Sequence, residues 1–404
     1  MSGIADFLGL RRNTLLLLGA LVLAGTGERL WLAFAPKYLQ FLGAGVLVIG
    51  LFDALQTLLG AVYAYPGGWI TDRWGQRRSL TAFSGISICG YLLVFVWQHW
   101  LALLLGTFLF LAWSALSLPA TFSVVATTLE ARKHTMGVSV QSLVRRAPMM
   151  IGPLIGGWLI TKYGWSEGIR LALAGCIVLG VITAGLQWLM VEPPTTHKNE
   201  VPLRFFDVVK RFSPTLRELL VSDILIRFCE RIPYAFVILW AMNYGGISAQ
   251  QYGYLVGIEM LTAVICYIPV AHLADKYGRV PFVFATFGFF TLFPLALLWA
   301  KSFAWLAVAF AIRGLKEFGE PSRKAMIIGE AAPQIRSRTY GAYYLLRDCL
   351  VTLGSFLGAW LWSISPQANF IGAALFGAVG TIWFWWWIAR KIRYNPKTAE
   401  ILIG

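Results

Sequence analysis

Two short stretches place a glutamate and an arginine side by side in the middle of long apolar runs. The first is GERLWLAF at residues 27–34, and the second is CERIPYAF at residues 229–236. A charge at the centre of a bilayer costs at least ~2.5–3.5 kcal/mol, so these residues should face a cavity or a partner. A glutamate that alternates between an arginine and a proton would be a coupling switch. An arginine is also suited to binding a carboxylate or phosphate.

Neighbouring helical residues point about 100° apart, so within each pair one residue lines a path and the other contacts an adjacent helix. We expect Arg145 to pair with Glu28 and, by symmetry, Arg347 to pair with Glu230. Further charges lie within apolar runs: Asp53, Arg146, Asp223, Arg227, Glu259, Arg313, Lys316, Glu317, Glu320 and Asp348.

The stretch RGLKEFGEPSRKA at residues 313–325 has the highest density of charge. A continuous helix would place five of its charges on one face: Arg313, Lys316, Glu317, Glu320 and Lys324. Opposite charges three and four residues apart can neutralise one another. The stretch is therefore either a self-satisfied ladder of ion pairs or part of the substrate and proton path.

The composition indicates which elements must position these charges. Hydrophobic residues make up 58% of the chain, the mean hydropathy is +0.67, and only 13% is charged, against about 25% in a soluble domain. The apolar runs predict an all-α membrane protein, with the lipid bilayer as its partner and twelve spans. The expected spans are 13–41, 46–67, 79–98, 101–129, 136–162, 168–190, 219–244, 250–273, 280–300, 303–331, 339–363 and 368–390.

The distribution of charge predicts the orientation. Basic residues gather in alternate loops and at both termini, which places both termini in the cytoplasm. This distribution also explains the net charge of +15 without a nucleic-acid partner. Five cysteines and four histidines lack metal-site spacing, so no metal and no cofactor are expected.

The two halves of the chain repeat one another. At an offset of 202 residues (230 − 28 = 202), Glu28-Arg29 aligns with Glu230-Arg231, and Gly156 aligns with Gly358. The repeat predicts two pseudo-symmetric six-helix bundles, 1–191 and 219–404, joined by a cytoplasmic linker, 192–218. In the linker, RFFDVVKRF is either an interfacial amphipathic helix or a solvated tether.

One loop in each half suggests a family. GGWITDRWGQRR at residues 67–78 resembles the signature loop between helices 2 and 3 of the major facilitator superfamily, and AHLADKYGRV at 271–280 is its weaker echo. The glycines permit a tight turn, and the resemblance implies a cytoplasmic gate latch. Its residues are Gly68, Asp72, Arg73, Gly75, Arg77 and Arg78, with Asp275, Lys276, Gly278 and Arg279 in the second half.

A second motif is narrower. GPLIGG, with Gly152, Pro153, Gly156 and Gly157, is similar to the end of a motif of proton-coupled drug antiporters. Ser139 and Pro148 stand where that motif has glycines. The alternative interpretation is ordinary packing of small residues.

The predicted function is secondary active transport by alternating access, and the chain is not expected to be an enzyme. The leading hypothesis is proton-coupled antiport, as efflux of a small organic solute or drug from a bacterial-type inner membrane, by a monomer. The alternative is a proton-coupled symporter or exchanger of an organic anion that uses Arg29 and Arg231. A lipid or lysolipid flippase is a third possibility. The sequence does not identify the substrate.

Overall fold

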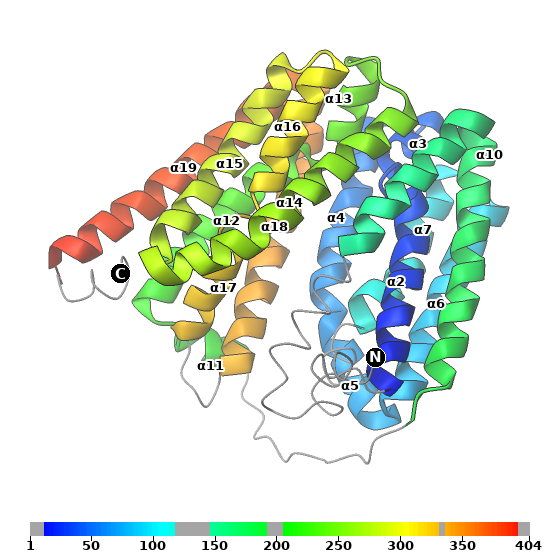
Figure 1. Ribbon diagram of the computed structural model, residues 1–404, viewed down its shortest axis with the longest axis horizontal. Coiled ribbons are helices and arrows are strands. Elements are labelled where there is room, and N and C mark those ends of the chain that lie inside the picture. Colours follow the sequence, from blue (N-terminus) through cyan, green and yellow to red (C-terminus); the bar gives the residue numbers. More distant parts are fainter. Residues whose placement is uncertain (1–11, 118–145, 192–204, 331–335, 395–404) are drawn as a thin grey trace. The chain divides into compact units, whose positions relative to one another are not determined.

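A computed structural model describes residues 12–117, 146–191, 205–330 and 336–394. Every regular element in these ranges is helical (Figure 1). The elements are α2 (Arg12–Leu32), α3 (Ala35–Phe41), α4 (Val46–Val62), α5 (Ala64–Trp74), α6 (Gln76–Val96), α7 (Trp100–Leu111), η1 (Ala112–Leu116), α10 (Arg146–Trp188), α11 (Phe205–Lys210), α12 (Pro214–Tyr234), α13 (Val237–Asn243), α14 (Ala249–Tyr277), α15 (Val280–Trp299), α16 (Phe303–Leu315), α17 (Glu320–Gly329), α18 (Arg336–Ile364) and α19 (Pro366–Tyr394).

Six helices of the described residues are long and apolar enough to cross a membrane, and a seventh is counted if α4 and α5, bent by 45°, form one span. The all-α membrane fold is therefore confirmed, whereas the count of twelve spans stays a prediction. Helix α10 covers two expected spans, and Gly164 (φ 80°) forms the kink between them. Helix α12 carries many charges, and the tenth expected span is broken between α16 and α17.

The two halves break their first helices at equivalent places. Helix α2 ends at Leu32 and α3 begins at Ala35, while α12 ends at Tyr234 and α13 begins at Val237. Both pairs of positions are 202 residues apart. A proline contributes to each break, Pro36 at the start of α3 and Pro233 at the end of α12.

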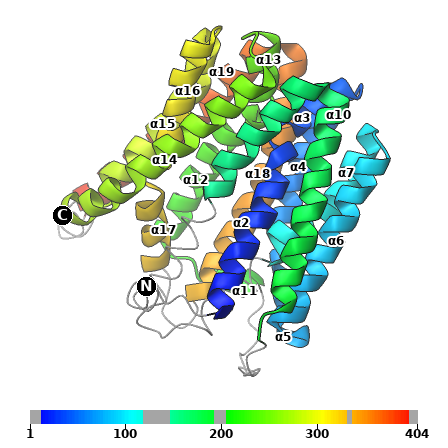
Figure 2. The ribbon, with the colours of Figure 1, turned by 45° about the vertical axis from the view of Figure 1, so that its right-hand side comes forward.

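Equivalent glycines also make equivalent contacts. Helices α2 and α10 run side by side (Figures 1 and 2), and a Cβ at Gly156 would overlap the carbonyl oxygen of Leu30. In the second half, a Cβ at Gly358 would overlap the carbonyl oxygen of Ile232. Because Leu30 and Ile232 are themselves 202 residues apart, the duplication extends to individual backbone contacts. The packing role of the GPLIGG glycines is thus visible in the structure.

This contact predicts the effect of adding one methyl group. We expect Gly156→Ala to lower the free energy of unfolding by about 1–3 kcal/mol, because backbone atoms of α2 leave no space for the new Cβ. Gly185→Ala in the same helix is the control, since no atom lies within 4 Å of its Cβ position. Thermal unfolding of the purified proteins in detergent would measure the difference. Equal melting temperatures for the two variants would contradict it.

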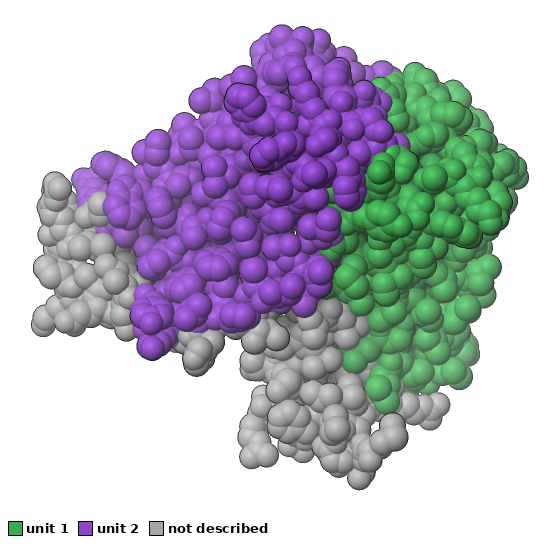
Figure 3. Space-filling view, turned by 45° about the horizontal axis from the view of Figure 1, so that its top comes forward, with its two compact units in different colours: residues 1–44, 58–199, 248–257 green, residues 45–57, 200–247, 258–404 purple. Residues whose placement is uncertain are grey.

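The chain packs as two compact units (Figure 3). Their residues are 1–44, 58–199 and 248–257 for unit 1, and 45–57, 200–247 and 258–404 for unit 2. Two helices are divided between the units: α4 after residue 57 and α14 after residue 257. The bundle boundaries expected from the sequence, at residues 191 and 219, stay a prediction.

Candidate functional site

Unit 2 contains a network of buried ion pairs. Its members come from α12, α14, α16, α17 and α18, and from the part of α4 that belongs to this unit. Six cations take part: Arg227, Arg231, Arg313, Lys316, Arg323 and Arg347. Six carboxylates take part: Asp53, Asp223, Glu230, Glu259, Glu320 and Asp348.

Glu230, the glutamate of the second Glu-Arg pair, lies between two cations. Its Oε1 is 2.7 Å from the Lys316 Nζ, and its Oε2 is 2.7 Å from the Arg227 Nη1. Lys316 also lies 3.6 Å from Glu259, whose carboxylate is 3.3 Å from the Nε of Arg313. Charges thus alternate from α12 through α16 to α14, and each carboxylate here has two cationic partners.

Arg323 is the most buried cation of the network, with 1% of its surface exposed. It forms ion pairs with Asp223 and, at 2.7 Å, with Glu320. Glu320 also pairs with Arg227, and the Tyr343 hydroxyl donates to Asp223 at 3.1 Å. Arg323 of α17 is therefore joined to α12 through Asp223, and both of its carboxylate partners have almost no contact with solvent.

The prediction that Arg347 pairs with Glu230 is wrong. Arg347 instead pairs with Asp348 at 2.7 Å and Asp223 at 3.4 Å, and its guanidinium lies 4.2 Å from the centre of the Tyr344 ring. The partners Lys316 and Arg227 occupy both oxygens of Glu230. Arg227 lies on the same helix as Glu230, three residues earlier, and the symmetry argument did not consider a partner so near in sequence.

The expected helical face at residues 313–325 is also wrong in part. Helix α16 ends at Leu315 and α17 begins at Glu320, with turns between them. The break rotates the second segment, so that Arg323 is buried and Lys324 is exposed. The sequence does contain a sign of this break. Gly319 directly precedes Glu320-Pro321, and a glycine followed by a proline in the first turn is typical of a new helix start. The sequence analysis therefore missed Arg323.

Asp53 contributes the carboxylate from α4. Its Oδ1 is 3.1 Å from Arg231, and its Oδ2 accepts a 2.6 Å hydrogen bond from Ser355 of α18. Arg231 also donates to the backbone oxygen of Asp53 at 3.1 Å and lies 4.5 Å from the Tyr234 ring centre. Arg231, the arginine of the second Glu-Arg pair, therefore forms an ion pair with a carboxylate.

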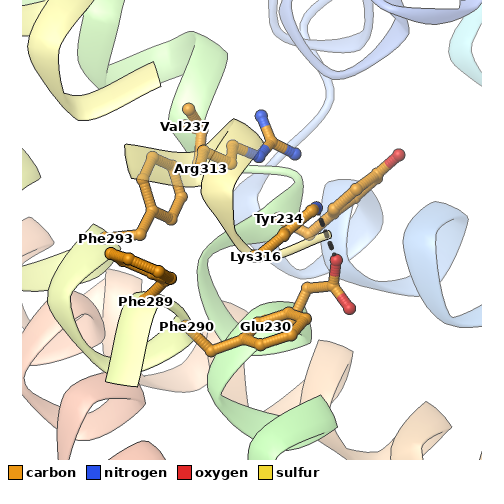
Figure 4. A pocket seen from close by; sticks show the side chains of 8 residues that line it. All are labelled: Glu230, Tyr234, Val237, Phe289, Phe290, Phe293, Arg313 and Lys316. Atoms are coloured by element: carbon orange, nitrogen blue, oxygen red, sulfur yellow. Dashed lines mark hydrogen bonds and ion pairs between the residues drawn. The ribbon is translucent and has the colours of Figure 1, made fainter. Parts of the chain in front are cut away.

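A narrow cavity lies beside the network (Figure 4), and its volume of about 10 Å³ has room for about one water molecule. Three phenylalanines from α15 form one wall: Phe289, Phe290 and Phe293. Glu230 and Lys316 meet at its edge (Figure 4), and the guanidinium of Arg313 lies 5.3 Å from the Phe293 ring centre and 5.6 Å from that of Tyr234. The cavity combines aromatic faces with both signs of charge, but in this structure it is far smaller than a site for an organic solute.

In unit 1, the described charges include both residues of the first Glu-Arg pair. Glu28 is 6% exposed, and Arg29 is half-buried with its Cβ against Gly152. Arg145, the expected partner of Glu28, lies outside the described residues. In the part of the chain that the structure describes, no carboxylate lies within 4 Å of the Arg29 guanidinium. In unit 2, Glu317, another charge expected on the path, is half-buried at the break between α16 and α17.

The signature loops have the backbone that the sequence predicted. Gly75 between α5 and α6 has φ 84°, and Gly278 between α14 and α15 has φ 80°. Both are tight turns that favour glycine. Arg77 lies 4.4 Å from the Trp188 ring centre, and Arg73 lies 5.5 Å from that of Trp69.

The remaining gate residues lie in or beside these turns. Gly68 is half-buried in α5, Asp72, Arg78, Lys276 and Arg279 are exposed or partly exposed, and the side chain of Asp275 lies outside the described residues. Their role as a gate latch stays a prediction.

Comparisons with known proteins agree with this architecture. The profile of the Major Facilitator Superfamily matches residues 16–245 and again residues 219–401. The chain is 25% identical to the uncharacterized MFS-type transporter MJ1560 of Methanocaldococcus jannaschii over 62% of this chain and 65% of that protein, just under two thirds of its length. It is 23% identical to the multidrug resistance protein MdtG of Proteus mirabilis, over 84% of this chain and 86% of that one.

A solved structure is similar as well. The nucleoside transporter NupG superposes with a TM-score of 0.75 over 93% of this chain and 98% of its own. Its sequence identity is 13%, so this likeness concerns the fold alone. The double match of the superfamily profile agrees with the duplication that the sequence predicted.

Proposed function

The chain belongs to the major facilitator superfamily, and on that premise we propose that it is a proton-coupled antiporter that exports a small organic solute. The family and its relatives indicate a secondary transporter in a membrane rather than an enzyme, as the sequence predicted. The finer proposal includes efflux across a bacterial-type inner membrane by a monomer with both termini in the cytoplasm. Similarity to MdtG, a multidrug resistance protein, supports export of drug-like solutes.

The observation that carries the proposal is the balance of charge in unit 2. Six cations face six carboxylates, and each member has at least one partner of opposite sign. Because unpaired charges are costly in a bilayer, a proton that neutralises one carboxylate leaves the network with an excess positive charge. A positively charged solute would add the same excess charge, so the network disfavours holding the proton and the solute together. Proton uptake and solute release are then two halves of one exchange.

The same balance weighs against the organic-anion alternative. An anion would need a cation without a carboxylate, but Arg231 is occupied by Asp53. Arg29 is the one observation in favour, since among the described residues no carboxylate pairs with it. An anion that binds Arg231 would therefore have to displace the Asp53 carboxylate. Replacing Arg29 by glutamate would abolish transport of an anion but only shift the specificity of a drug antiporter.

Proton movement in proteoliposomes tests the proposal. We would enclose a pH-sensitive dye and add tetraphenylphosphonium, then benzoate, then a lysophospholipid. The account predicts that tetraphenylphosphonium changes the internal pH, and that Glu28→Gln and Glu230→Gln lose the response. Glu218→Gln should keep it, since Glu218 lies near the start of α12 outside the network. Transport of any probe without a pH change would contradict proton coupling, and a response to benzoate alone would favour the anion exchanger.

A further inference from the structure

The carboxylates of the network differ in how many cations compensate them. Asp223, Glu230, Glu259 and Glu320 each lie within 4 Å of at least two cationic side chains. Among the described members of the network, Asp53 and Asp348 each have one. The Asp348 side chain is 28% exposed, so water can solvate its charge. The Asp53 side chain is 3% exposed, and among the described residues Arg231 is its one cationic partner.

Few groups face Asp53. Helix α12 supplies the Arg231 guanidinium and, next to it, the negative charge of Glu230; helix α18 supplies the Ser355 hydroxyl. One Nη of Arg231 serves both the carboxylate and the backbone oxygen of Asp53. If Arg231 moved away, the buried carboxylate would keep only a neutral hydroxyl and would have to take a proton.

Asp53 lies in one of the two helices that the compact units share. Gly45 and residues 46–57 of α4 pack in unit 2, where Gly50 lies against Ala359 of α18, and the rest of α4 belongs to unit 1. Helix α14 is divided in a similar way, but its described contacts in unit 1 carry no charge. There Gly253 lies against the Pro153 backbone, and the Gln250 amide donates to Thr161 at 3.0 Å. Of these two described contacts, only that of α4 contains a group that a proton can neutralise.

We propose that Asp53 is the proton-binding site of this transporter, and that its protonation releases residues 45–57 from α12 and α18. The inference rests on the proton coupling proposed above and names the group that performs it. A proton from water forms an O–H bond on the Asp53 carboxyl, and only the ion pair with Arg231 breaks. Arg231 remains charged, with the Tyr234 ring and the Glu230 carboxylate beside it.

A reporter cysteine tests this without any substrate. Thr352 is 6% exposed and shares the face of α18 that carries Ser355 and Ala359, so Thr352→Cys should become reactive when α4 moves away. The rate of labelling by N-ethylmaleimide would be measured from acidic to alkaline pH, with and without Asp53→Asn. The ratio of the two rates at each pH cancels the intrinsic pH dependence of the thiol. The parent protein with its five native cysteines gives the background.

The expected ratio is near one at acidic pH, where Asp53 is already neutral, and rises to about tenfold or more at alkaline pH, because a hydrogen-bonded ion pair is then lost only in the variant. Asp348→Asn should keep the ratio near one throughout. Arg231→Gln should match Asp53→Asn, and the double variant should add nothing. A ratio that is raised equally at every pH would show a structural role, and a ratio of one at every pH would show no latch; either result overturns the proposal. Because no transport is measured, both results are distinguishable from failure of the proposed antiport.

Discussion

Replacing Arg323 by methionine is expected to lower the free energy of unfolding by about 3–5 kcal/mol, the typical cost of removing one partner of a buried ion pair. Arg323 is 1% exposed and pairs with Asp223 and Glu320, which are themselves buried. Methionine fills a similar volume but supplies no donor. Asp223 would then keep only the longer contacts with Arg347 at 3.4 Å and Arg227 at 3.7 Å and the Tyr343 hydroxyl, while Glu320 would keep Arg227.

Lys324→Met is the matched control, because Lys324 is the neighbouring cation and is exposed. Surface substitutions usually change stability by less than about 0.5 kcal/mol. Thermal unfolding in detergent and the yield of folded protein would compare the two variants. If Lys324→Met lowered the free energy of unfolding as much as Arg323→Met, the result would support the continuous helical face that the sequence suggested. It would contradict the break at Lys316–Gly319.

Replacing Glu230 by glutamine is expected to slow transport by about a hundredfold, because two cations lose one carboxylate in a site of low dielectric. The Lys316 Nζ and Arg227 Nη1 both lie 2.7 Å from Glu230. The double variant Glu230→Gln/Lys316→Met removes one charge of each sign and should transport faster than Glu230→Gln alone. Initial rates of tetraphenylphosphonium transport, at equal amounts of reconstituted protein, would measure this. Independent, multiplicative losses from the two changes would mean that the pair does not act as a unit.

Features that depend on local sequence were predictable. Gly75 and Gly278 occupy turns with positive φ, as the signature loops required. The offset of 202 residues holds for the contacts of Gly156 and Gly358 with the carbonyls of Leu30 and Ile232. Close backbone packing tolerates only glycine, so a duplicated contact leaves a duplicated glycine in the sequence.

The pairing of the charges was not predictable in the same way. Symmetry suggested Arg347 for Glu230, but Arg227 and Lys316 are nearer and lie in α12 and directly after α16. Arg323 was missed because the break at Gly319 changes which residues share a face. A helical period identifies a face only while the helix continues, and partner choice among several charges depends on packing that one sequence does not specify.

The central claim is that proton movement drives the solute. The most direct measurement is uptake of radiolabelled tetraphenylphosphonium into proteoliposomes under an imposed pH gradient, with the membrane potential clamped at zero. The account predicts accumulation against the probe's own gradient when the interior is acidic, none when the two sides have equal pH, and loss of accumulation in Asp53→Asn but not in Glu218→Gln. Uptake that is the same with and without a pH gradient would contradict proton-coupled antiport.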